Sequence, residues 1–209
     1  ADLYIYPNTL KVLMLSGAQV KEWLEMSAGQ FNTLTIGGVD QPLINEDFPS
    51  YNFDVIDGVT YQLDLSVPPK YSVAGELANA DSQRIQNLHY QGQPVADEQM
   101  FLVASNNYRA SGGGNFPGIT ADKIVIDAPD ENRQAVADYL VVKTQQNPEG
   151  GFDPSADKNW HFVALPGTSA LFWGSAGDAA RSFAAGNAAI EYVSQNDEGF
   201  GVYRINFDD

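Results

Sequence analysis

The stretch from residue 106 to residue 116, NNYRASGGGNF, has the composition of a loop that could hold a flat ligand. Its three consecutive glycines lack a Cβ, which permits positive φ angles and close approach of a bound molecule to the backbone. An aromatic ring, Tyr108, and several amide, hydroxyl and guanidinium groups stand directly before the glycines. The apolar run 100–104 precedes the stretch and predicts a buried strand, so the loop lies at a strand end, where functional residues concentrate. A wide turn with core aromatics explains the composition equally well.

A second aromatic element lies at the start of the chain, in the segment LYIYPNTL. Pro7 favours an extended conformation at Tyr6. If this segment faces the 106–116 loop, Tyr6 and Tyr108 would form two walls of a slot with glycine backbone as its floor. Nucleobases are bound in this way, and each aromatic stack contributes about 1–3 kcal/mol with little dependence on base identity. We expect Tyr4 and Phe116 to be core rings, whereas the residues alone leave Tyr6 and Tyr108 open.

Motifs for hydrolytic chemistry are missing from the sequence. The two histidines, His89 and His161, stand in unrelated contexts without metal-ligand spacing, and the chain has no cysteine. Ser175 lies in the sequence GSAG, which satisfies the G-x-S-x-G pattern, but no histidine follows it to complete a triad in the required order. There is no phosphate-binding G-x-x-x-x-G-K-[ST] loop. We therefore expect no catalytic residue, metal site or cofactor in this chain, and no phosphoesterase activity from the chain alone.

The formal net charge of −16, from 11 basic and 27 acidic side chains, argues against binding of polymeric nucleic acid. A small anionic substrate stays possible if its charge is neutralised elsewhere. No apolar run approaches the roughly 20 residues that a membrane span requires. The first ten residues lack the basic and apolar regions of a signal peptide.

The elements that must position these residues follow from hydrophobic periodicity. Helices are predicted from residues 16–17 to Gly29, from 128–130 to before 147, and over 178–185. Strands are predicted over 9–15, 51–65 around an Asp57-Gly58 turn, 85–90, 100–104, 123–126, 160–165, 170–173, 190–193 and 202–207. This irregular alternation predicts a mixed α/β or α+β fold. The Pro- and Gly-rich residues after 147 mark a possible internal boundary near 147–158.

Three segments together resemble the C-terminal domain of the 5'-nucleotidase family, in its branch of bifunctional 2',3'-cyclic-nucleotide 2'-phosphodiesterase/3'-nucleotidases. They are LYIYPNTLKVLMLSGAQVKEWLEMSAGQFN, YNFDVIDGVTYQLDLS and FLVASNNYRASGGGNFPG. The resemblance continues through APDENRQAVADYL and GFGVYRINF, so it covers residues 1–209 as one substrate-specificity domain. It implies a mixed α/β fold with α-β-β-α layers.

The resemblance also implies a division of labour. In this family an N-terminal metallophosphoesterase domain, absent from this chain, carries two divalent metal ions and performs the chemistry. The C-terminal domain clamps the base of a nucleoside or nucleotide between two aromatic rings, here Tyr6 and Tyr108. A periplasmic location and 2',3'-cyclic and 3'-nucleotide substrates are implied as well. The further ligand contacts that it suggests are Asn107, Arg109, Ser111, Gly112, Gly113 and Gly114.

Two features depart from the 5'-nucleotidase pattern. Gly114 stands where many 5'-nucleotidases have an acidic residue, and the rings are tyrosines rather than phenylalanines. Both features resemble the cyclic-phosphodiesterase branch. The alternatives are a stand-alone binding domain, for example for carbohydrate, and a structural domain whose glycine loop is only a turn.

Overall fold

The computed structural model describes residues 6–147 and 149–208, and the chain divides into two compact units. The first unit comprises residues up to Trp23 together with 94–159, and the second comprises 24–93 together with the residues from Trp160 onward. Each unit is thus built from two separate stretches of sequence. Among the described residues, no helix is long and apolar enough to cross a membrane.

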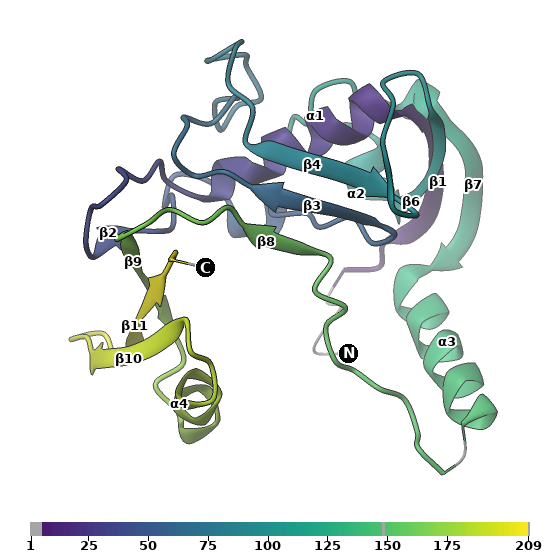
Figure 1. The fold of residues 1–209 in the computed structure, drawn as a ribbon. Helices are drawn as coiled ribbons and strands as arrows, with labels where there is room; N and C mark the ends of the chain where they lie inside the picture. Colours follow the sequence, from purple (N-terminus) through teal and green to yellow (C-terminus); the bar gives the residue numbers. More distant parts are fainter. Residues whose placement is uncertain (1–5, 148, 209) are drawn as a thin grey trace. The chain divides into compact units, whose positions relative to one another are not determined.

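The first unit is built on a three-stranded antiparallel sheet of order β6-β1-β7. Its strands are β1 (Thr9–Ser16), β6 (Met100–Asn106) and β7 (Ile124–Glu131). Within β1, Leu13 and Leu15 are fully buried while Met14 is exposed, the period-two pattern of a strand with one covered face. The short helices α2 (Asn107–Ala110) and η3 (Ala121–Lys123) flank the glycine-rich loop, and α3 (Asn132–Gln146) follows β7 (Figure 1).

Two predictions for this unit are wrong in detail. The run 100–104 forms a strand, but it is not buried, because β6 is a sheet edge and Met100 and Leu102 lie on an accessible face. The helix expected from 128–130 begins only at Asn132, because β7 continues to Glu131, which pairs with Thr9. Pro129 is tolerated in β7 because an edge strand with an irregular register can do without one backbone donor.

Helix α1 (Gly17–Ser27) connects the two units, and its start and end agree with the prediction apart from a final turn in η1 (Ala28–Gln30). Ser16 caps its beginning, since its Oγ accepts a hydrogen bond from the backbone N–H of Gln19.

The second unit contains two four-stranded mixed sheets, of order β10-β11-β9-β2 and β5-β4-β3-β8. Each contains one parallel pair, β2 with β9 and β3 with β8, beside antiparallel pairs. The remaining elements are α4 and η2. The bounds of the strands and helices of this unit are β2 (Gln41–Pro42), η2 (Ser50–Asn52), β3 (Val59–Leu63), β4 (Ile85–Tyr90), β5 (Gln93–Pro94), β8 (Trp160–Phe162), β9 (Ser169–Gly174), α4 (Asp178–Ala185), β10 (Ile190–Gln195) and β11 (Gly201–Asn206). The predicted mixed α/β class is confirmed.

The strand expected before the Asp57-Gly58 turn does not form. The described segment instead contains η2, and its backbone is held by a side chain: Ser27 Oγ donates to the carbonyl of Asp54 and accepts from its N–H, both at 2.7 Å. Phe53 turns into an aromatic cluster, with its ring centroid 5.2 Å from that of Phe31 and 5.7 Å from that of Trp160. Tertiary contacts therefore override the alternating pattern.

Arg84 lies at the centre of the second unit with no solvent exposure. Its guanidinium donates to the carbonyl oxygens of Ala28, Phe31 and Val67 at 2.7–3.0 Å, and to Thr33 Oγ1 at 3.1 Å. The equally buried Glu25 accepts from the backbone N–H groups of Arg84 and Ile85. Burial lowers the pKa of Arg84 to about 10, an effect opposed by Glu25 and Asp64.

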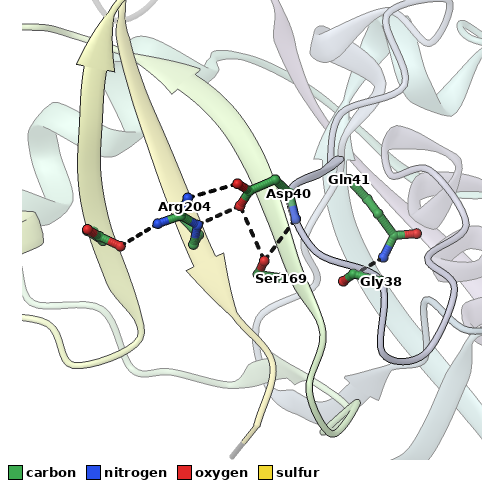
Figure 2. A network of polar contacts seen from close by, with 6 residues as sticks. Gly38, Asp40, Gln41, Ser169 and Arg204 are labelled. Carbon is green, nitrogen blue, oxygen red and sulfur yellow. Dashed lines mark hydrogen bonds and ion pairs between the residues drawn. The ribbon is translucent and has the colours of Figure 1, made fainter.

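A second polar network, nearer the surface, ties the loop before β2 to β9, β11 and β10 (Figure 2). Arg204 binds both carboxylate oxygens of Asp40, at 2.5 and 2.8 Å, and Glu191 at 2.6 Å. The backbone N–H of Asp40 donates to Ser169 Oγ at 2.9 Å. This network fixes the parallel pairing of β2 with β9.

Candidate functional site

The register of β1 against β6 brings the two tyrosine segments to the same end of one sheet. Leu10, near the start of β1, pairs with Asn106, the last residue of β6. The segment that enters β1 and the loop that leaves β6 are therefore neighbours. A hydrogen bond joins them directly, since the Thr9 N–H donates to Asn107 Oδ1 at 2.9 Å.

The glycine-rich loop begins with a capped helical turn. Asn106 Oδ1 accepts a hydrogen bond of 2.8 Å from the Arg109 N–H, which satisfies a backbone donor at the start of α2. Successive turns continue this pattern, with Gly112 donating to the Arg109 carbonyl and Gly113 donating to the Tyr108 carbonyl. The loop is thus a series of hydrogen-bonded turns whose shape is defined before any ligand binds.

The three glycines serve two different needs. Gly112 and Gly114 have φ angles of +93° and +79°, a region that residues with a Cβ rarely adopt. Gly113 instead lies against Tyr108: a Cβ there would stand 2.7 Å from both Cε1 and Cε2 of the ring and 2.5 Å from its carbonyl oxygen. Equal distances to both edges indicate contact with a ring face. The backbone of Gly113 therefore supports one side of Tyr108.

Arg109 lies beneath the loop, with only 3% of its surface exposed. Its guanidinium stands 3.8 Å from the ring centroid of Phe116 and 5.6 Å from that of Tyr108, and it donates a hydrogen bond to the Gly113 carbonyl. Phe116 is itself buried, as expected of a core ring, and packs edge-on against Trp23. This position makes Arg109 a brace that connects both ends of the loop.

The two tyrosines are exposed, Tyr6 by 68% and Tyr108 by 45%. Ser111 is exposed as well, while Asn107 is partly buried and uses Oδ1 on the Thr9 backbone. Tyr4 lies outside the described residues. Phe116 and Asn106, which hold Arg109 and cap α2, were not singled out as support for the loop. An asparagine directly before a short helical turn was the one signal that could have identified the cap.

The other sequence candidates are not assembled into a reactive site. His161 Nε2 lies 2.8 Å from the amide nitrogen of Gln62, and His89 Nδ1 lies 2.6 Å from the carbonyl of Asn87. Ser175 Oγ accepts from the backbone N–H of Gly177. Within residues 6–147 and 149–208, no group of three His, Cys, Asp or Glu side chains could hold a metal ion. The residues of the described chain thus do not fit the two metal ions of the family.

Comparisons with known proteins identify relatives of the whole chain. Residues 1–121 match the family model of the 5'-nucleotidase C-terminal domain. The chain is 50% identical over its full length to the trifunctional nucleotide phosphoesterase protein YfkN of Bacillus subtilis, of which it covers 14%. It is 46% identical over 99% of its length to the 2',3'-cyclic-nucleotide 2'-phosphodiesterase/3'-nucleotidase of Haemophilus influenzae, of which it covers 32%. The chain spans at most about a third of the length of either relative.

A solved structure gives the same indication. A Staphylococcus aureus protein described as a 5'-nucleotidase superimposes with a TM-score of 0.58 and 29% identity, over 76% of this chain and 28% of the other. With the family model matching more than half of its residues, the chain belongs to the 5'-nucleotidase C-terminal domain family.

Proposed function

We propose that this chain is the nucleoside-recognition domain of a larger phosphoesterase, and that it clamps the base of its substrate between Tyr6 and Tyr108. The substrates of the larger protein are 2',3'-cyclic nucleotides and 3'-nucleotides. The observation that carries the proposal is the β1–β6 register, which brings both exposed tyrosine segments to one end of a sheet. The names of the curated relatives support the substrate class.

In this proposal each element of the site has a physical task. Tyr108 rests one ring face on Gly113 and offers the other to the base. Aromatic stacking accepts any base, because every base has a π-face. Ser111, Asn107 and the backbone of Gly112 and Gly114 provide polar contacts at the edge of the stack. Arg109 contributes by holding the loop in place, since its guanidinium is buried under it.

The phosphoester chemistry lies with a separate domain of the larger protein. A metallophosphoesterase domain with two divalent metal ions would supply the activated water and neutralise the phosphate. The strongly acidic chain described here suits the uncharged base, and it leaves the anionic phosphate to the metals. The periplasm, implied by the resemblance, is the compartment that we propose for the whole protein.

Calorimetric titration of the purified chain with adenosine, adenosine 3'-phosphate and maltose tests this function. We expect the two adenosine compounds to bind and maltose not to bind. Tyr108→Ala and Tyr6→Ala each weaken adenosine binding by about ten- to a hundredfold, because each removes one stack of roughly 1–3 kcal/mol. Tyr139→Ala, which removes another exposed tyrosine, is the matched control and leaves the affinity unchanged.

Gly113→Ala provides a second variant that leaves both rings in the sequence. Its methyl group would collide with the Tyr108 ring and carbonyl, so we expect a loss of affinity close to that of Tyr108→Ala. Gly186→Ala is its control, because a Cβ there meets nothing nearer than 3.6 Å and its φ is −87°. Equal binding of adenosine and maltose, or full affinity in all three site variants, would rule out the clamp.

A further inference from the structure

The second unit has an open groove of about 850 Å³ between the segment after β2 and the turn that joins β10 to β11. Its walls are defined by hydrogen bonds. On one side, the Asn45 N–H donates to the Gln30 carbonyl at 2.8 Å, and Asn45 Nδ2 donates to the Gly29 carbonyl at 3.0 Å. On the other side, Asn196 Oδ1 accepts from the N–H groups of Glu198 and Phe200 at 3.1 and 2.9 Å. The groove therefore has a fixed shape.

Two exposed aromatic rings line this groove, which we call the acidic groove. Tyr51 is 71% exposed and Trp173 is 58% exposed, values that are high for side chains of this size. Aromatic faces carry negative electrostatic potential, and they pack equally well against methylene groups and against organic cations.

Three carboxylates, Glu46, Asp197 and Glu198, also line the acidic groove, and all three are exposed. Among the described residues, none of the three has an ion-pair partner, and no Lys or Arg lines the groove. The local charge of −3 adds to the overall excess of acidic residues, so the groove attracts cations. The described carboxylates are not grouped closely enough to hold a metal ion.

Gln30 supplies an independent indication that the acidic groove takes a hydrogen-bond donor. It lines the groove with only 5% of its surface exposed, and its Oε1 is buried with no hydrogen-bond partner. Buried polar atoms are nearly always paired, so an unpaired acceptor at a groove points to a missing donor. Glycine 29 beside it packs against Phe48, which closes the groove below with an apolar ring.

From these features we infer that the acidic groove binds an aliphatic diamine or polyamine. Ammonium groups have N–H donors and positive charge, which complement the Gln30 acceptor and the three carboxylates. The methylene chain between the ammonium groups packs against Tyr51 and Trp173. A neutral sugar could stack on the same rings, but it would leave the carboxylates uncompensated. The inference does not depend on nucleoside binding, because all of these residues belong to the second unit.

Calorimetric titration with 1,5-diaminopentane and spermidine, at low and at physiological salt, tests this inference. We expect both amines to bind and their affinity to fall as salt rises. The neutral isostere 1,5-pentanediol, which has the same chain without charge, and maltose should not bind. Binding of the diol or of maltose with equal affinity would overturn the inference in favour of a site for neutral ligands.

Two variants separate the acidic groove from general attraction to an acidic protein. Asp197→Asn/Glu198→Gln and Trp173→Ala should each weaken diamine binding by about tenfold, because each removes charge or a cation-binding ring. Glu76→Gln/Asp81→Asn removes the same charge from exposed positions outside the groove and serves as the matched control. Near-ultraviolet circular dichroism checks that each variant is folded. Equal weakening in the control, or no measurable amine binding, would refute the inference.

Discussion

Arg84 and Arg109 are both buried arginines that donate to backbone carbonyls, yet they stabilise different kinds of structure. Arg84 is fully enclosed and joins η1, Phe31 and Val67 in the second unit, with Glu25 fixing the backbone beside it. Arg109 lies between an aromatic ring and a loop carbonyl, and the loop above it carries the exposed Tyr108. The first arginine therefore holds a core together, and the second holds a surface in the shape that a ligand requires.

The comparison teaches that burial of a charge does not by itself reveal its role. What distinguishes the two residues is what they hold: Arg84 satisfies carbonyls that would otherwise be buried without partners, whereas Arg109 orients a loop whose outer side is open to solvent. Arg204 completes the series, because its side chain is 25% exposed and its partners are carboxylates near the surface (Figure 2).

Arg84→Met should cause the largest loss of stability. It removes every donor to the carbonyls of Ala28, Phe31 and Val67 and leaves Glu25 without a compensating charge. Removing one partner from such a buried charged network costs about 3–5 kcal/mol, measured as the free energy of unfolding in urea. Arg133→Met, at a surface position 45% exposed, is the control and should change stability by less than about 0.5 kcal/mol. Similar stabilities for the two variants would show that Arg84 does not hold the core.

Arg109→Lys should have a smaller effect on stability and a clear effect on the loop. Lysine keeps the charge but loses the planar group that stacks on Phe116, an interaction worth about 1–2 kcal/mol. We expect faster amide hydrogen exchange over residues 106–116 and adenosine binding weakened about tenfold. Arg133→Lys serves as the reference. If exchange in the loop stays as slow as in the parent, Arg109 does not hold it.

Asp40→Asn tests the exposed end of the series through pH. The hydrogen bond and charge of Arg204 lower the pKa of Asp40 below its ordinary value of 3.8, against the opposing effect of burial. Because the folded-state pKa is the lower one, the Asp40–Arg204 pair stabilises the fold above pH 3.8, and this contribution is lost as the pH falls through the folded-state pKa. The melting temperatures of parent and variant should therefore differ at pH 7 and converge near pH 3. Curves that stay parallel from pH 7 to pH 3 would contradict this coupling, and Asp81→Asn gives the baseline.

The parts of the fold that the sequence predicted are those with strong local patterns. Helix α1 and helix α4, and strands β1, β4, β9 and β11, follow their periodicity closely because their apolar faces are covered as the pattern requires. The start of α3 and the segment around Phe53 were predicted wrongly. In both places a long-range contact decided the conformation: the pairing of Glu131 with Thr9, and the bonding of Asp54 to Ser27.

The candidate site divides in the same way. The sequence by itself determined that aromatic, amide and glycine residues are concentrated in 106–116 and at Tyr6, and its similarity to known proteins determined the family. Only the tertiary structure decided that these two segments are neighbours, that Gly113 supports the Tyr108 ring, and that Arg109 lies under the loop. The physical reason is that side-chain type is local, whereas burial and strand register depend on residues about 100 positions apart, such as Thr9 and Asn107.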